Sequence, residues 1–389
     1  MKSFSYLFCA SLLSSTLLFS QHSRSNQPCC QVQGEPLQCY GPAYNAPAAI
    51  DVNYKKYKYS CPQFSGFIDA SFIYWYAGED GLKLASTGVL SGGTVYYAQN
   101  TTSLEQSFNY KPGFKVGLGA TIGHEWTVHA EYTWYRGQNS TQSGTLSGTS
   151  LTAGTAAVAA GTNVWLVDDW FLQGSGGQAL SGSSISSTWR IGLDILDVIA
   201  SRPFYQGRRI IISPYAGLRA AWIRQSMKVE LTEAAGLFEF LPTQPIGSRN
   251  YSNSWSIGPR VGFIGECLLP EGFRLEGEFA ASLLYMKYTS LRHSEDRAST
   301  SFNAGPYTAS MSNYGTLRPE TDMSLGIGWG RYLACRDYHI DFSVDYDFMI
   351  FWSQNMLRSL LLDAILTGTD PGSANLYFHG LTITGRFDF

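Results

Sequence analysis

The chain has 389 residues, of which 15% are charged, 14% are aromatic and 40 are glycine. Soluble domains carry about 25% charged residues, so this composition is unusual for a protein folded in water. The net charge of -3 gives no reason to expect a nucleic-acid partner. After the first twenty residues, no segment stays apolar for the roughly 18 residues that a membrane-spanning helix needs, which excludes a helical membrane protein.

Residues 1–20 have the features of a secretory signal peptide. Lys2 precedes an uncharged apolar run from Tyr6 to Phe19, and the small Ser20 offers a cleavage point. A single membrane anchor is the alternative, but the run is short for a membrane span. We therefore expect an exported protein in an oxidising compartment.

Residues 21–62 form a polar segment that contains four of the six cysteines left after signal cleavage. An even number of cysteines in an exported protein suggests disulfides, although their pairing stays open. No C-x-x-C pair or neighbouring histidine cluster indicates a metal site. The disulfide candidates are Cys29, Cys30, Cys39, Cys61, Cys267 and Cys335.

From residue 63 to 389, apolar and polar residues alternate in successive segments. A strand with one face in lipid and one in water needs this pattern, because successive side chains point to opposite faces. In the last segment, Leu381, Ile383, Phe387 and Phe389 share one parity, and Thr382, Thr384, Arg386 and Asp388 share the other. Further alternating segments lie near 64–77, 114–122, 126–135, 189–195, 216–222, 255–266, 273–285, 318–329 and 340–348.

One parity of these segments is apolar and carries no charge. Arg or Lys facing lipid at the membrane midplane costs about 2–4 kcal/mol, so a charge-free face indicates lipid contact. In segment 189–195 this interpretation turns Trp189 and the following odd-numbered residues outward, and Arg190 and Asp194 inward. Large aromatic residues near the segment ends fit the interfacial girdles of a membrane barrel. A soluble β-sandwich is the alternative, but its outer face would tolerate charges.

Short and long links alternate between the segments. The short links are Gly123–Glu125, Arg202–Gly207, Leu268–Glu271 and Tyr332–Asp337; the long links lie near 87–103, 140–186, 227–250, 290–313 and 353–374. Outer-membrane barrels have short periplasmic turns and long external loops. The sequence therefore predicts an all-β fold, a transmembrane antiparallel up-and-down β-barrel of about ten strands. A further strand pair within 78–103 or 140–186 would make twelve, and residues 353–366 look more helical than extended.

Several blocks between about Phe67 and Phe389 carry a family resemblance. The blocks are FIDASFIYWYAGEDGLKLA, YKPGFKVGLGATIGHEW, ISPYAGLRAAWI, WSIGPRVGF, ASLLYMKY, LRPETDMSLGIGW and LTITGRFDF. In this order they resemble the strands of the Legionella-type pore-forming outer membrane proteins, whose relatives in chlamydia-like bacteria are called major-outer-membrane-protein-like. The resemblance implies a pore-forming role in the outer membrane. Segment 21–62 lies outside it and looks more like a chlamydia-related addition.

Alternation places many charged residues inside the barrel. They would line a wet channel and select solutes, or they would form ion pairs that fill a narrow barrel. The acidic excess between 266 and 347 predicts a mild preference for cations. The expected pore-lining residues are Lys115, Glu131, Arg190, Asp194, Arg219, Arg260, Glu266, Arg274, Glu276, Glu278, Arg318, Glu320, Asp322, Asp341, Asp345, Asp347 and Arg386.

We therefore expect an outer-membrane pore for ions or small solutes, with a structural or adhesive barrel lacking an open channel as the alternative. An outer-membrane hydrolase is the third class considered. No G-x-S-x-G or H-E-x-x-H motif occurs, and His129 and His339 are expected to be polar lumen residues. We thus expect no enzymatic activity, no catalytic or metal site and no cofactor.

The expected partners follow from this topology. They are outer-membrane lipid and the barrel-assembly machinery, which would recognise the terminal strand ending at Phe389. Copies of the chain or other cysteine-rich envelope proteins would join it through disulfides, because all six cysteines would be periplasmic. Local stapling of segment 21–62 is the alternative role for the cysteines.

Overall fold

The computed structural model describes residues 65–91, 94–97, 102–122, 126–144, 162–167, 170–171, 180–207, 209–232, 246–296, 306–333, 338–360 and 374–389. The predicted signal peptide 1–20 and segment 21–62 lie outside these ranges, as do all the disulfide candidates except Cys267. The described residues are almost entirely β-structure, with a single 3-10 turn at Pro270–Gly272. No helix among them is long and apolar enough to cross a membrane.

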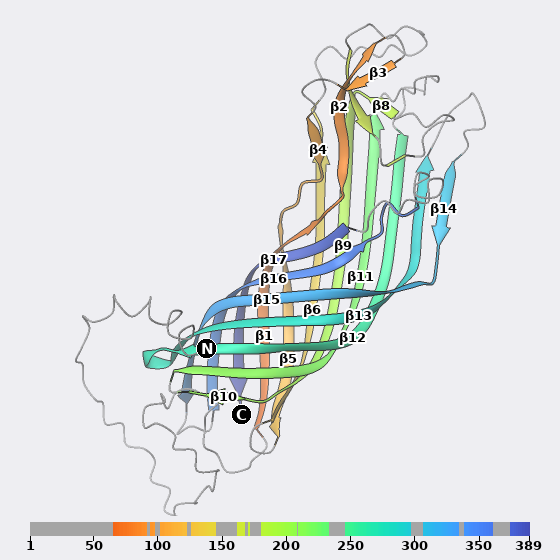
Figure 1. Cartoon of the computed structure of the whole chain (residues 1–389). Helices are drawn as coiled ribbons and strands as arrows, with labels where there is room; N and C mark the ends of the chain where they lie inside the picture. The colour runs from red at the N-terminus through yellow and green to blue at the C-terminus, as the bar shows by residue number, and fades with distance from the viewer. Residues whose placement is uncertain are drawn as a thin grey trace, which may run out of the picture.

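Ten of the described strands close into an antiparallel barrel (Figure 1). Around the wall they are β1 (Ser65–Glu79), β5 (Tyr110–Ile122), β6 (Trp126–Gln142), β9 (Ser184–Ser201), β11 (Ile210–Thr232), β12 (Ile246–Leu268), β13 (Phe273–Asp296), β15 (Tyr314–Leu333), β16 (Tyr338–Asn355) and β17 (Ala374–Asp388). Strand β17 pairs with β1 and completes the barrel. Two short strands extend it, β10 (Tyr205–Gln206) beside β11 and β14 (Tyr307–Met311) beside β13. The predicted ten-stranded up-and-down barrel is confirmed.

The first and last strands meet at the rim that carries the short turns. The backbone N–H of Gly66 donates to the carbonyl of Phe389, and the N–H of Phe389 donates back, each at 3.0 Å. At the same rim the turn between β12 and β13 holds Glu271 and Gly272 in left-handed conformations, with φ of 63° and 85°. A side chain at Gly272 would collide with the carbonyl of Gly330, so glycine permits this close turn.

Toward the opposite rim, the long links build a second, separate sheet (Figure 1). Its strands are β2 (Lys83–Ser91), β3 (Thr94–Tyr97), β4 (Ser103–Glu105), β7 (Thr162–Val167) and β8 (Leu180–Gly182). The further strands considered within 78–103 and 140–186 therefore exist, but they do not enter the barrel wall. Strand β16 continues to Asn355 and a turn follows at 357–360, so the helix expected over 353–366 does not form in the described part of that segment.

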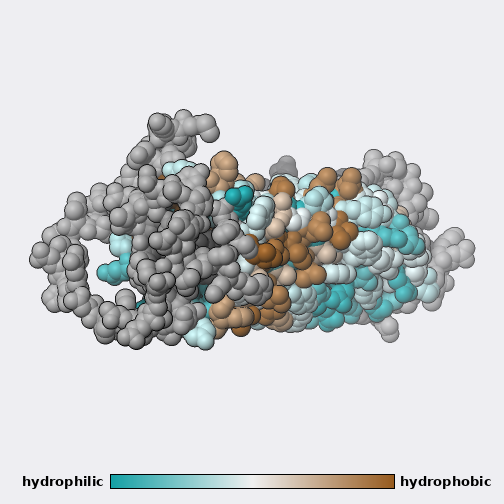
Figure 2. Space-filling view, turned by 90° about the horizontal axis from the view of Figure 1, so that it is seen from below, coloured by the Kyte–Doolittle hydropathy of each residue, from teal (hydrophilic) through white to brown (hydrophobic). Residues whose placement is uncertain are grey.

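A belt of exposed apolar side chains surrounds the barrel nearer the short-turn rim. Its members are between 39% and 66% exposed and include Ile68, Phe72, Val116, Leu118, Val198, Leu218, Val261, Leu283, Leu325, Ile327, Phe342, Val344, Leu381 and Ile383. Figure 2 shows apolar side chains gathered along the visible wall, with hydrophilic surface toward one end. A continuous exposed apolar surface of this kind is the lipid-facing band of a membrane barrel.

The strands continue well beyond this belt into water. Strand β11 has 23 residues, a length of about 75 Å at roughly 3.3 Å per residue, whereas the apolar band of such barrels is only about 25 Å tall. Its outward residues change from Leu218 and Trp222 to Arg224 and Lys228. Trp222 lies directly opposite Trp255 on β12, so these tryptophans mark the boundary of the lipid-facing band.

The expected orientation of side chains is reversed on β9. Trp189 and Leu193 are fully buried inside the barrel, whereas Arg190 is exposed. Asp194 pairs in register with Trp134 and Trp222 on the neighbouring strands, which places it on the outer face. Arg190 and Asp194 therefore do not point into the lumen, contrary to the prediction. The reason is that this part of β9 lies beyond the lipid band, where the interior is apolar and the exterior is wet.

Candidate functional site

The lumen of the lipid-facing half contains a polar cavity of about 310 Å³. Its charged lining comprises ten carboxyl groups, Asp69, Glu131, Asp197, Glu266, Glu276, Glu278, Asp322, Asp341, Asp345 and Asp347, and five cationic groups, Lys115, Arg219, Arg260, Arg274 and Arg386. The His129 imidazole and the hydroxyl groups of Ser71, Thr133, Ser324, Ser343, Thr382 and Thr384 complete its polar surface. The carboxyl groups outnumber the cations by two to one, so this cavity is acidic.

Most of the residues that alternation turned inward lie around this cavity. They are Lys115, Glu131, Arg219, Arg260, Glu266, Arg274, Glu276, Glu278, Asp322, Asp341, Asp345, Asp347 and Arg386. Glu320 also points inward but is completely buried behind Arg219, and Arg318 lies farther out, within 3.9 Å of the Met356 sulfur. The prediction did not include Asp197, because the alternating segment assigned on β9 ended at residue 195 and had the opposite parity. Exposed Leu196 and Val198 on either side of Asp197 are the signal that could have corrected it.

Two buried arginines join four strands across the cavity. Arg219 on β11 holds both carboxylate oxygens of Asp197 at 2.6 and 2.7 Å and also donates to Glu320 at 2.6 Å. Arg260 on β12 holds both oxygens of Asp322 at 2.6 and 2.9 Å. Asp322 accepts from Arg219 as well, at 2.8 Å, and so links the two guanidinium groups. Such charge-assisted bidentate pairs fix the side chains in one geometry.

Separate ion pairs hold other charged side chains in place. Arg274 binds both carboxylate oxygens of Asp341 at 2.5 and 2.8 Å. The Lys115 ammonium lies 3.2 Å from Asp347, which also accepts a hydrogen bond from the Thr382 hydroxyl at 2.7 Å. These pairs leave the cavity lined by charges that are bound rather than freely mobile.

The outer half of the lumen is filled by a cluster of buried apolar residues, here called the apolar plug. Wall strands contribute Ile73, Trp75, Tyr135, Trp189, Leu193, Ile223, Met227, Leu284, Met286, Tyr288, Met349, Phe351, Leu376 and Phe378, among others; the links contribute Leu82, Leu84, Ala85, Trp165, Trp170, Phe171, Leu357 and Leu360. Every one of these side chains is at most 7% exposed. In the described part of the chain, the plug closes the lumen on the side away from the short turns.

Trp75 forms the boundary between the plug and the cavity. Its indole N–H donates to the Thr382 hydroxyl at 3.1 Å, and the Lys115 ammonium lies 5.0 Å from its ring centre. Its other neighbours are the plug rings of Tyr135 and Phe378, both with centroids at 6.3 Å. The polar and apolar parts of the interior therefore meet at Trp75 and at Met349, a plug residue that also lines the cavity.

Polar groups inside the plug are also hydrogen-bonded. The Trp170 indole N–H donates to the carbonyl of Lys83 at 2.6 Å, which ties two links together. Glu79, at the end of β1, accepts from the Trp189 indole at 2.9 Å and from the Gln225 amide at 2.8 Å. Glu79 lies beyond the lipid band, and burial raises the pKa of its carboxyl group to about 8.

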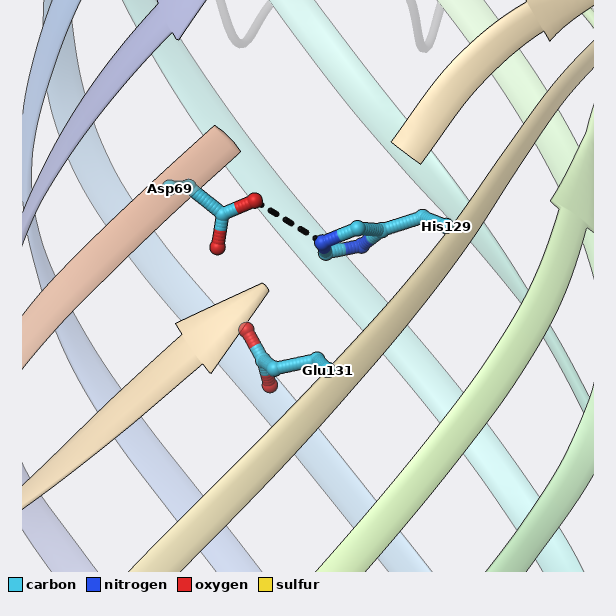
Figure 3. Close-up of side chains that lie close together, drawn as sticks. All are labelled: Asp69, His129 and Glu131. Atoms are coloured by element: carbon cyan, nitrogen blue, oxygen red, sulfur yellow. Dashed lines mark hydrogen bonds and ion pairs between the residues drawn. The ribbon is translucent and has the colours of Figure 1, made fainter. Parts of the chain in front are cut away.

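Three potential metal ligands meet on the cavity wall (Figure 3). Asp69 comes from β1, and His129 and Glu131 come from β6, two residues apart on the inward face. The His129 Nε2 atom lies 2.9 Å from Asp69 Oδ1, and one ligand atom from each residue lies within 4.8 Å of the other two. The strand between them, β5, presents only Gly117 at this level.

The family model of the Legionella pneumophila major outer membrane protein precursor matches residues 61–389. The chain belongs to this family. Membership confirms the resemblance carried by the strand blocks and agrees with the barrel and its lipid-facing belt. The protein is thus an outer-membrane β-barrel of the major outer membrane protein type.

Solved structures of outer-membrane proteins are similar to this chain at low sequence identity. The outer membrane protease OmpT of Escherichia coli is 11% identical, with 86% of this chain and 99% of that chain covered and a TM-score of 0.39. A major outer membrane protein of Thermus thermophilus is 11% identical over 81% and 99% of the two chains, with a TM-score of 0.28. A Pseudomonas aeruginosa FadL homologue is 7% identical over 84% and 90%, with a TM-score of 0.23. No curated protein matches the chain.

Proposed function

We propose that this family member is an outer-membrane channel for ions or small solutes whose described conformation is closed. The observation that carries the proposal is the acidic cavity of about 310 Å³ inside the lipid-facing half, immediately below the apolar plug. A barrel that served only as a scaffold would not need charged residues around an internal cavity at membrane depth, where ionisable groups are costly. Passage through the channel requires the plug to move.

The plug contains parts that are able to move without breaking the wall. Trp170, Phe171 and the segment Leu82–Ala85 belong to links between wall strands. Exposing the first two side chains to water would cost about 3–6 kcal/mol, since a buried large apolar side chain contributes roughly 1.5–3 kcal/mol. A free-energy difference of that size between the closed and open states keeps the open state below about 1% of the population.

The charge of the cavity sets the expected selectivity. Ten carboxyl groups face five cationic groups around the lumen, and an excess of one sign raises the local concentration of the opposite ion. The channel is therefore expected to prefer cations. Reversal potentials in a potassium chloride gradient measure this directly, and an anion preference would contradict the proposal.

Conductance of the purified protein in planar bilayers tests the gate. The wild type should open rarely, and the double variant Trp170→Ala with Phe171→Ala should open far more often at the same voltage. Phe204→Ala is the matched control, because Phe204 is 85% exposed at the short-turn rim, and it should behave like the wild type. If the double variant is folded, as judged by the heat-dependent shift of barrels in gels, and still never conducts, the channel proposal fails.

A structural surface barrel without a channel is the second candidate. It is favoured by the bidentate pairs of Arg219 and Arg260 across the lumen and by the tight packing of the plug. Silent bilayers for both the wild type and the double variant would support it.

We also propose that disulfides stiffen the periplasmic side of the exported protein. Cys267 lies at the short-turn end of β12 and is disulfide-bonded. Non-reducing gels of outer-membrane fractions distinguish the arrangements. Ladders that collapse with reductant support links between copies or to other envelope proteins, whereas a single monomer band supports bonds within one chain.

A further inference from the structure

Asp69, His129 and Glu131 form a cluster on the cavity wall (Figure 3). The strand register explains how these residues meet. Asp69 on β1 lies directly opposite Gly117 on β5, and Gly117 lies directly opposite Glu131 on β6. His129 follows on the same inward face of β6, opposite Gly119. Two segments far apart in the sequence thus converge over one strand.

Glycine on the middle strand makes this convergence possible. A Cβ atom at Gly117 would collide with both the Asp69 carboxylate and His129 Nε2. At Gly119 a Cβ atom would collide with the ring of Phe67, which lies 5.3 Å from the His129 ring. The wall therefore has a recess between β1 and β6, and the donor atoms of the cluster occupy it.

The donor set suits a divalent transition metal. One imidazole nitrogen and two carboxylate oxygens match the N/O ligands that zinc accepts at about 2.0–2.2 Å. In a tetrahedral site the ligand atoms lie about 3.4 Å apart, so the present spread of up to 4.8 Å needs only side-chain rotation. The 2.9 Å contact between His129 and Asp69 is already that close. All three residues line the cavity, which leaves the remaining coordination positions open to water.

The surrounding charges favour a cation. Two cationic side chains lie near the cluster, Lys115 on β5 and Arg386 on β17, directly opposite Asp69. The Lys115 ammonium group is held by Asp347 at 3.2 Å, and the Arg386 guanidinium group is held by Asp388 at 3.1 Å. Asp197, which is paired with Arg219, adds a further carboxylate on the Glu131 side of the cavity. A divalent ion would therefore enter a region with more negative than positive charge.

We propose that Asp69, His129 and Glu131 bind one divalent transition-metal ion of the zinc type. The ion joins β1 to β6 across β5 and adds positive charge to the cavity wall. Binding does not depend on whether the barrel conducts, so failure of the metal site and failure of the channel proposal are separate outcomes.

Titration of the refolded full-length protein in detergent with Co²⁺, and then with Zn²⁺ as competitor, tests the site. The wild type should bind one Co²⁺ per chain with visible absorption bands typical of mixed nitrogen and oxygen ligands, and Zn²⁺ should displace it. His129→Ala should weaken binding at least about tenfold, because even loss of outer-shell support costs 10–100-fold in metal affinity. His379→Ala is the matched control, since this imidazole shares a hydrogen bond with Tyr346 on the outward face.

A second variant keeps the test independent of ligand removal. Gly117→Ala retains all three ligands but places a methyl group in the recess, and it should also weaken Co²⁺ binding. The displaced atoms are side-chain ends, so the barrel should fold and keep its gel shift. Unchanged Co²⁺ affinity in both His129→Ala and Gly117→Ala would overturn the proposal, as would the absence of a stoichiometric site in the wild type.

Discussion

Replacement of Glu79 by glutamine should make the outer half of the barrel more stable at alkaline pH. Glu79 is buried in the plug and accepts hydrogen bonds from Trp189 and Gln225. Glutamine resembles the protonated carboxyl group in shape. Within the described residues the Gln225 Oε1 atom is buried without a hydrogen-bond partner, so the Gln225 amide can turn and accept from the amide introduced at position 79. Glu79→Gln therefore keeps two hydrogen bonds and removes a group that is able to ionise.

The size of the effect follows from the pKa of Glu79. Burial raises this pKa from 4.5 to about 8, so the folded state binds the proton more tightly than the unfolded state. The resulting stability is fully present below pH 4.5 and is lost as the pH rises toward 8. A tenfold change in proton affinity is worth about 1.4 kcal/mol, so the total loss is of the order of 5 kcal/mol. The introduced glutamine does not titrate, and the variant escapes this loss.

Guanidinium unfolding in detergent micelles, followed by tryptophan fluorescence, measures the change in stability with pH. Measurements at about pH 5.5 and about pH 8.5 span most of the titration of Glu79. The wild-type midpoint should fall at the higher pH, and the Glu79→Gln midpoint should fall much less. Glu105→Gln serves as the control, because Glu105 is exposed on β4, and it should keep the wild-type pH dependence. Equal pH dependence in the wild type and Glu79→Gln would refute the assignment of this loss to Glu79.

Two further substitutions test the wall by the same unfolding measurement. Arg219→Ala removes the partner of buried Asp197 and Glu320 and should lower the free energy of unfolding by about 3–5 kcal/mol. The control Arg224→Ala, which removes a side chain that is 58% exposed, should lower it by about 1 kcal/mol or less. Similar losses for the two variants would contradict the buried network. Leu325→Arg, at a lipid-facing position that is 58% exposed, should cost about 2–4 kcal/mol, and a neutral result would place this position outside the lipid band.

The sequence pattern was sufficient for the part of the barrel that crosses the membrane. On β16 and β17, Phe342, Val344 and Ile383 face outward, and Asp345 and Thr382 face inward, as alternation predicted. Lipid imposes this arrangement, because a charged side chain on the outer face is expensive there. The rule that the apolar residues of a strand face outward applies only to the part of the strand that contacts lipid.

Beyond the membrane the same pattern has the opposite meaning. Ile191 and Leu193 are apolar and alternate with polar residues, but they face the plug. Farther along β9, Leu196 and Val198 face lipid from the other parity. Alternation shows that a segment is a strand but does not tell whether its apolar face points inward or outward. The shift of the apolar residues from odd to even positions on β9 was therefore missed. Apolar residues on both parities between 191 and 198 are the local sign of such a change.

The cluster of Asp69, His129 and Glu131 could not be predicted from the sequence, for a different reason. His129 looked like an isolated lumen histidine, because metal motifs are recognised by the spacing of ligands along one segment. Asp69 reaches it only through the pairing of β1 with β5 and of β5 with β6. Strand register, which alternation does not determine, decides which inward residues become neighbours.

Along each long strand, the apolar residues face outward within the lipid band and inward beyond it. The position of this change also fixes how deep the barrel lies in its membrane. On β11, outward Trp222 marks the end of the lipid contact, inward Ala221 begins the plug, and Arg224 follows on the outer surface. A thicker bilayer would pull hydrocarbon over Arg224 and Arg190, and a thinner one would leave Leu218 in water. Either displacement is unfavourable, so the protein has a single preferred depth in the bilayer. A change in bilayer thickness would therefore act on the same short stretch of the strands where the plug seals the interior.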